Sequence, residues 1–227
     1  MNKLLVALFV LFLSQVSFAL EGGEAEWKLI TEEDGVKVFK RDFPGSTFKE
    51  FRGEIVIKSS LTSFAALLLD GDNMSSWMHK TKKVETVEQI NDRERIAYML
   101  FDFTPMPSRD LVVRNKITQD PTSLAVTYHM EYMPEHSALE DTGSSHMEGI
   151  TGFVLAEPVG DGNIKITYQA HVEPGSWILN WIPMAGVITN SLLSSTPLYT
   201  LLNAKEEIEK DEYQNMTLSF IQEPSKS

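Results

Sequence analysis

Three His-x-Glu pairs are the residues of this sequence whose types and spacing could do chemistry. In each pair a histidine stands two residues before a glutamate, and the pairs are His129 with Glu131, His146 with Glu148, and His171 with Glu173. In a β-strand this spacing puts both side chains on one face. Three neighbouring strands could therefore gather imidazoles and carboxylates, as zinc binding or general acid–base catalysis requires.

The apolar residues around two of these pairs place them away from the core. In residues 124–133 the alternating apolar set includes Tyr128 and Met130, and in residues 164–172 it includes Tyr168. His129 and His171 occupy the other parity and face the opposite side of their strands. We interpret the pairs as solvated cross-strand pairs. A metal site on the outer face is the alternative, and we expect no metal, cofactor or catalytic residue.

The dipeptide Arg109-Asp110 is a second candidate for a functional site. In one interpretation the guanidinium and the carboxylate anchor a turn through hydrogen bonds to the backbone. In the other, a charged group at the end of a cavity pairs with the polar head of a ligand. Asp102 and Arg114 are weaker candidates of the same kind. The sequence contains no cysteine, no G-x-S-x-G motif and no glycine-rich phosphate loop.

Residues 174–204 contain no charged side chain. The segment is long enough to span a bilayer, but its three prolines, its two glycines and its polar residues make a lipid-immersed helix costly. We interpret it as a lid over an apolar cavity. Within it, a helix is predicted from Pro183 to about residue 211, kinked at Pro197. Residues 184–204 form its buried or ligand-facing half, and residues 205–212 form a solvated surface.

The remaining chain predicts mostly strands. Apolar alternation indicates strands over residues 36–40 and 48–58, and a meander that continues through residues 82–127, 124–133, 146–156 and 164–172. A helix is predicted over residues 61–69, capped by Ser59 or Ser60. Residues 27–31 are predicted as a helical or irregular lead-in. Strands followed by one long helix indicate an α+β fold, with a curved antiparallel sheet around the C-terminal helix and space left between them.

The N-terminus has the features of a secretory signal peptide, with Lys3, an apolar run from residue 4 to 13, and Ala19 at the cleavage position. We expect a signal peptide over residues 1–19, one domain over residues 20–213 and a flexible tail over residues 214–227. An uncleaved anchor is the alternative to cleavage. The export signal and the absence of cysteine together predict a periplasmic or secreted protein that uses no disulfide bonds.

The net charge of −12 argues against nucleic acid as a partner. It also argues against strong attraction to an anionic membrane surface, so any transient membrane contact should rest on apolar groups. We favour a monomer.

The chain resembles a START domain, the lipid-binding module of steroidogenic acute regulatory-related lipid-transfer proteins. The matching motifs occur in order over about residues 27–213, and they are residues 34–38 (DGVKV), Trp77, residues 105–110 (PMPSRD), Pro174-Gly175, Trp181-Ile182 and the last helix with Pro197. The resemblance implies a helix-grip fold, also called START or Bet v 1-like. It implies a closed apolar tunnel for one lipid and a C-terminal helix that opens for exchange at a membrane. The export signal is a departure, since the best-known relatives are cytosolic.

We therefore expect the protein to bind, and to carry, one lipid or other hydrophobic molecule in a tunnel gated by the C-terminal helix. The residues expected to form the tunnel and its lid are Arg109, Leu111, Val113, Tyr128, Met130, Tyr168, Trp181, Met184, Val187, Ile188 and Leu198. Two alternatives remain open. One is a helix-grip enzyme, cyclase- or hydrolase-like, acting on a hydrophobic substrate. The other is a ligand sensor, for which the loop at residues 134–145 is the only hint.

Overall fold

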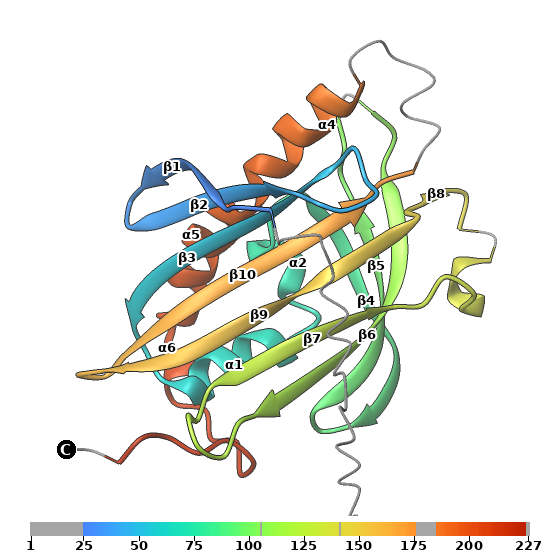
Figure 1. The fold of residues 1–227 in the computed structure, drawn as a ribbon. Helices are drawn as coiled ribbons and strands as arrows, with labels where there is room; N and C mark the ends of the chain where they lie inside the picture. The colour runs from blue at the N-terminus through green and yellow to red at the C-terminus, as the bar shows by residue number, and fades with distance from the viewer. Residues whose placement is uncertain (1–24, 105, 141, 176–184, 226–227) are drawn as a thin grey trace, which may run out of the picture.

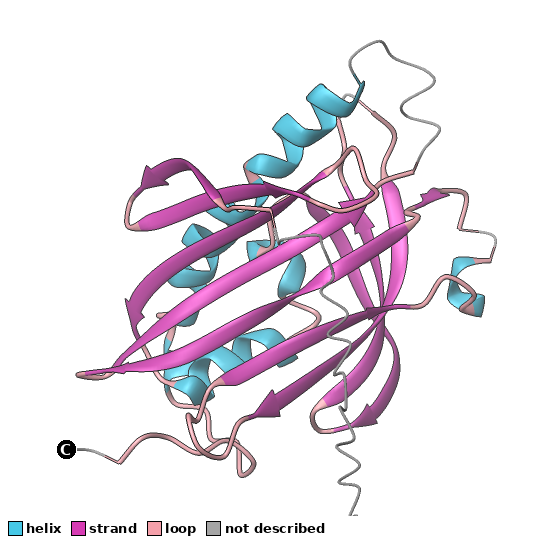
Figure 2. Cartoon of the chain, viewed as in Figure 1, coloured by secondary structure: helices cyan, strands magenta, loops and turns pink. Residues whose placement is uncertain are grey.

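One curved sheet of ten strands organises the chain in the computed structural model (Figure 1). The structure describes residues 25–104, 106–140, 142–175 and 185–225. The expected signal peptide at residues 1–19 lies outside the described residues. Figure 2 shows that the long strands wrap around a group of helices on one side of the sheet. This arrangement confirms the predicted antiparallel α+β helix-grip fold.

The strands follow a meander with one long-range closure. In chain order they are β1 (Lys28–Glu33), β2 (Val36–Asp42), β3 (Lys49–Lys58), β4 (Thr81–Asn91), β5 (Glu94–Phe101), β6 (Arg109–Gln119), β7 (Val126–Tyr132), β8 (Ser145–His146), β9 (Gly149–Gly160) and β10 (Asn163–Glu173). Their order in the sheet is β1-β2-β3-β10-β9-β7-β6-β5-β4, with β8 paired to β6. The β3–β10 pairing joins an early strand to the last one, and among the strand pairs of the described residues only the short β6–β8 contact is parallel.

The lead-in predicted as helical or irregular over residues 27–31 is a strand from residue 28 onward. Residues 28–33 are the edge strand β1, which pairs antiparallel with β2. Leu29 on this strand is 54 % exposed, so the segment has no clear apolar face. Pairing with β2, rather than local periodicity, makes it a strand.

The first helix forms as the sequence predicts. It is α1 (Leu61–Leu69), and the Ser60 side chain accepts a hydrogen bond of 2.9 Å from the backbone N–H of Ser63. At its other end, the Arg95 guanidinium donates to the carbonyl oxygens of Leu68 and Leu69 at 3.2 and 2.6 Å. Side chains therefore satisfy free backbone groups at both ends of this helix.

The remaining helices are α2 (Met74–Trp77), the 3₁₀ turn η1 (Ser137–Leu139), α4 (Ala185–Ser194), α5 (Thr196–Ile208) and α6 (Asp211–Gln214). The predicted C-terminal helix is thus divided at Ser195, next to the expected kink. Pro197 has no N–H to donate to the preceding turn, which accounts for the break. Within the described ranges, no helix is long and apolar enough to cross a bilayer.

Helix α5 lies directly on the concave face of the sheet at Gly53 of β3. A Cβ atom placed on Gly53 would be 2.7 Å from Leu201 Cδ1 and 2.8 Å from Pro197 Cβ. Leu201 is 2 % exposed and belongs to the main apolar core. The missing side chain at residue 53 therefore sets how closely α5 approaches β3.

The C-terminal half of α5 is not the solvated surface predicted for residues 205–212. Glu207 is 8 % exposed and Ile208 is fully buried. The Glu207 carboxylate accepts hydrogen bonds from Asn73 Nδ2 at 2.7 Å and Lys210 Nζ at 2.6 Å. The prediction was wrong for these two residues because α1 and α2 cover this part of the helix.

The chain after α6 also differs from the expected flexible tail. Ile221 is buried, and Glu223 accepts hydrogen bonds from the backbone N–H of Leu61 and Thr62 at 3.2 and 2.6 Å. This carboxylate lies at the N-terminus of α1, where a negative charge is favourable. Residues 215–225 are therefore docked on the domain.

Replacing Gly53 by Ala should destabilise the protein by about 1–3 kcal/mol, because the added methyl group overlaps Pro197 and Leu201. Chemical denaturation measures the free energy of unfolding. Gly149→Ala is the matched control, since its added Cβ would meet only Glu173 side-chain atoms at 3.7 Å or more, and we expect a change within about 0.5 kcal/mol. Equal effects at the two positions would contradict the close helix–sheet approach.

Candidate functional site

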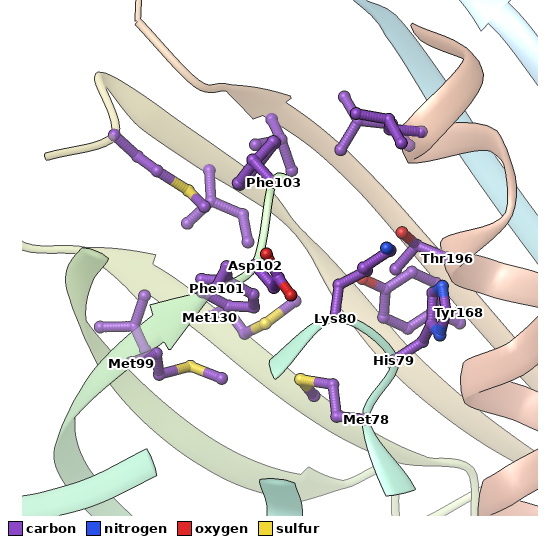
Figure 3. Close-up of a pocket in the computed structure, with 16 residues that line it drawn as sticks. Met78, His79, Lys80, Met99, Phe101, Asp102, Phe103, Met130, Tyr168 and Thr196 are labelled. Atoms are coloured by element: carbon purple, nitrogen blue, oxygen red, sulfur yellow. The ribbon is translucent and has the colours of Figure 1, made fainter. Parts of the chain in front are cut away.

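An apolar cavity lies between the concave face of the sheet and the junction of α4 with α5 (Figure 3). Its apolar lining consists of Met78, Met99, Phe101, Phe103, Val113, Met130, Met147, Ile150, Val172, Leu192 and Leu193. Its polar lining consists of His79, Lys80, Asp102, Tyr168 and Thr196. The space that water-sized molecules could occupy with their centres is about 60 Å³. This is enough for a few waters but far below the 300–1,000 Å³ or so of typical ligand pockets.

Three parts of the fold position this lining. Strands β5, β6, β7, β9 and β10 supply the wall, and alternation along β10 points Tyr168 and Val172 to the same side. The segment that follows α2 supplies Met78–Lys80. Helix α4 supplies Leu192 and Leu193, which cover the cavity from the side opposite the sheet.

Four methionines give the wall an adaptable surface. Met78, Met99, Met130 and Met147 come from four separate segments and all line the cavity. Methionine is unbranched, has three rotatable side-chain bonds and carries a polarizable sulfur, so it can change shape around different apolar groups. The wall can therefore widen around a ligand at lower cost than one built from β-branched residues.

Tyr168 places a hydroxyl group in these apolar surroundings. Its residue is 8 % exposed, and among the described residues its hydroxyl makes no hydrogen bond. Burial raises the pKa of Tyr168 from 10.0 to about 12. The phenol therefore keeps its proton at any physiological pH and is available as a hydrogen-bond donor.

The other polar residues of the cavity include a carboxylate that is already engaged. Asp102 Oδ1 accepts from the backbone N–H and the hydroxyl of Thr104 at 2.9 and 2.6 Å, and it lies 3.6 Å from Lys82 Nζ. The Thr104 hydrogen bonds, together with Lys82 and Lys80, lower the pKa of Asp102. The pKa of His79 is also lowered, by burial and by Lys80. His79 is therefore neutral near pH 7.

The structure brings three of the predicted site residues together. Val113, Met130 and Tyr168 all line the cavity. Leu111 and Tyr128 are buried in the main core beside it, at 0 and 2 % exposed, without forming its wall.

The predicted lid residues are placed differently. Val187 and Ile188 are 60 and 36 % exposed, so they lie on the outer face of α4 and do not point into the cavity. Leu198 is buried, and with Val187 it borders a separate groove between the helices and β1–β3. Trp181 and Met184 lie outside the described residues.

Sequence reasoning missed Leu192, Leu193 and Thr196 on the helices, as well as the Met78–Lys80 segment. A signal for the helical residues exists, because Thr189, which is fully buried, begins an i, i+3, i+4, i+7 series with them. Because two members of this buried stripe are threonines, a search for apolar residues at helical spacing does not detect it. The Met78–Lys80 segment has no periodicity, so only the fold reveals its position.

Arg109 is fully buried and does not line the cavity. Its Nε donates to the Pro174 carbonyl oxygen at 3.2 Å, and its Nη1 donates to the Ser108 carbonyl oxygen at 3.3 Å. Burial lowers the pKa of the Arg109 guanidinium. These contacts fit the turn-anchoring interpretation, since they fix the chain where β10 ends. Arg114 lies on the outer face and pairs with Glu94 at 2.6 Å.

The His-x-Glu pairs do not line the cavity. His129 is exposed, and His146 Nδ1 lies 2.5 Å from the buried Asp110 Oδ1. His171 is 3 % exposed rather than solvated, because the Phe43 ring stacks on it at 3.6 Å between centroids. The chain between β2 and β3 covers this part of the outer face. The described residues contain no group of three or more possible metal ligands.

Tyr168 should make stability fall at alkaline pH. Because its pKa is about 12 in the folded protein and 10.0 ordinarily, its contribution is complete below pH 10 and is lost as the pH rises to 12. In Tyr168→Phe, the fall in the free energy of unfolding over this range should be smaller by about 2 kcal/mol. Denaturation at a series of pH values measures it, with the exposed Tyr199→Phe as control. If the free energy of unfolding fell equally in Tyr168→Phe and in the unmodified protein, the Tyr168 hydroxyl would be solvated and the account of its burial would be wrong.

Comparison with known proteins identifies the family of this fold. A family model described as the START domain matches residues 15–187. The chain is 29 % identical over 186 residues to an uncharacterized protein of Pseudomonas aeruginosa, covering 82 % of this chain and 88 % of that protein.

Two solved structures show the same architecture. The STAR-related lipid transfer protein (fragment 25–204) from Xanthomonas axonopodis has a TM-score of 0.71 and 25 % identity, covering 81 % of this chain and 99 % of that chain. Human StAR-related lipid transfer protein 5 has a TM-score of 0.69 and 14 % identity, covering 81 % and 86 %, and supports the fold alone. Because the family model matches well over half of the sequence, the chain belongs to the START domain family.

Proposed function

We propose that this protein binds one lipid or other hydrophobic molecule in the cavity under α4 and α5 and carries it between sites. The observation that carries the proposal is the cavity itself, which is lined mainly by apolar side chains from the sheet and both helices. Burial of apolar ligand surface there would contribute about 25 cal/mol per Å². The similarity to a bacterial STAR-related lipid transfer protein supports the same function.

Helix α4 is the part of the wall that must move for this function. The cavity of about 60 Å³ is smaller than a typical ligand, so binding requires the wall to expand. Among the described residues, helix α4 contacts mainly α5 and the start of β3, and its Leu192 and Leu193 pack against the core. At the start of β3, Asn190 accepts from the backbone N–H of Lys49 at 2.8 Å and donates to the Thr47 carbonyl oxygen at 3.2 Å. Displacing α4 breaks few contacts, whereas displacing α5 would break the core.

We also propose where in the cell the protein works, on the basis of its sequence. The expected signal peptide and the absence of cysteine favour a periplasmic or secreted protein. Transient membrane contact would use the exposed apolar residues of α4, Val187 and Ile188. We propose a monomer that exchanges its ligand at such a surface.

We propose binding without turnover. The enzymatic alternative needs polar groups that can exchange protons with a substrate, and the three His-x-Glu pairs lie outside the cavity. Replacing Asp102 and His79, which do line it, would separate the two functions. Loss of turnover with retained binding would favour the enzyme.

Filling the cavity should abolish uptake. Leu193→Trp places a larger side chain where α4 faces the sheet, and we expect transfer of a fluorescent lipid from liposomes to fall at least about tenfold, because the added ring occupies the ligand's space. Ser191→Trp is the matched control at an exposed position of the same helix that does not line the cavity, and it should retain uptake. Circular dichroism confirms that both variants fold. Equal uptake by the two variants, or no uptake by the unmodified protein, would refute the proposal.

A further inference from the structure

The polar residues of the cavity are not spread around its wall. Lys80, Tyr168 and Thr196 come from the segment after α2, from β10 and from α5. Figure 3 shows the Lys80 amine extending toward Thr196 and the Tyr168 hydroxyl. One part of the cavity therefore has three donor groups, and His79 and Asp102 are the other polar residues of its wall.

The Lys80 ammonium has no carboxylate partner among the described residues. No described Asp or Glu oxygen lies within 4.0 Å of its Nζ. The Asp102 carboxylate accepts hydrogen bonds from Thr104 and lies 3.6 Å from Lys82 Nζ, and it feels the Lys80 charge only from beyond 4.0 Å. A half-buried cation in apolar surroundings is costly unless an anion accompanies it.

The two hydroxyl groups that line the same cavity as Lys80 are also free to bind. Neither the Tyr168 hydroxyl nor the Thr196 hydroxyl makes a hydrogen bond to any described residue. Tyr168 keeps its proton and can only donate to an anion. An ammonium and two hydroxyl donors together match the two oxygens of a carboxylate.

The backbone of Lys80 has a conformation that a lysine rarely adopts. Lys80 has a φ of 64°, in the left-handed region where glycine would fit without strain. A lysine there costs free energy that the surrounding structure must offset. Its carbonyl oxygen accepts a hydrogen bond of 2.7 Å from the Asp102 N–H, which holds the strained turn in place.

We propose that Lys80, Tyr168 and Thr196 form a subsite for the carboxylate of the ligand, so that the ligand class is a monocarboxylic acid with a long apolar body. This inference rests on the proposed function, because the apolar body occupies the same cavity. The cavity is small, at about 60 Å³, so its wall has to expand less for one chain or one flat ring system than for a molecule with two acyl chains. The neutral His79 adds no second charge, which fits a ligand with a single anionic group.

The test compares two probes of equal chain length, hexadecanoic acid and hexadecanol, by displacement of a fluorescent apolar dye. The unmodified protein should bind the acid at least about tenfold more tightly than the alcohol, since bonds to a charged group are the stronger ones. In Lys80→Met, which keeps an unbranched side chain but removes the ammonium group, this preference should disappear while the alcohol binds as before. Tyr168→Phe should reduce the preference by a smaller factor.

Lys83→Met is the matched control. Lys83 lies on the same strand as Lys82, is more than half exposed and pairs with Glu85 at 2.6 Å, so its loss should leave the preference intact. Equal binding of acid and alcohol by the unmodified protein would overturn the carboxylate subsite and leave the cavity's function standing. Binding of neither probe would overturn both proposals. Loss of the preference in Lys83→Met as well as Lys80→Met would show general charge attraction and contradict the subsite.

Discussion

The close contact between α5 and β3 at Gly53 is the constraint on which the rest of the structure depends. Because no side chain separates them, Pro197 and Leu201 rest on the strand itself, and α5 is fixed to β3, the third strand from the β1 edge of the sheet. Helix α4 precedes α5 in the chain and makes fewer contacts with the sheet. These contacts include the hydrogen bonds of Asn190 to the backbone of residues 47 and 49. A firmly packed helix thus supports a lightly held one, and the cavity lies under the part that can move.

The cavity differs from the core around it in chemistry as well as in packing. Its methionine-rich wall can adapt to an apolar body, and its donor groups gather around Lys80, where they can fix a polar end. A site with one adaptable apolar part and a few oriented polar groups is the usual form of a small-molecule pocket. The charged side chains that anchor the fold, such as Arg109 and Arg95, make their hydrogen bonds to backbone carbonyls elsewhere.

Strand alternation and helix capping in the sequence were sufficient for the α+β architecture, for α1 and for the inward direction of Tyr168. They failed for residues whose burial depends on a segment that is distant in the sequence. His171 has outward parity but is buried by Phe43, and Glu207 is covered by the α1–α2 region. Val187 looked buried because it is apolar, whereas Thr189 on the same helix is the buried one. Lys80 could not be found, since a turn without periodicity places it in the cavity.

The central claim is that the chain holds one hydrophobic molecule in this cavity, and native mass spectrometry tests it most directly. Protein purified without detergent and then offered lipid extract should show a single added mass, which is released on denaturation and identified by fragmentation as a molecule with a large apolar body. A protein that shows only its own mass under native conditions, before and after exposure to the extract, would contradict the account.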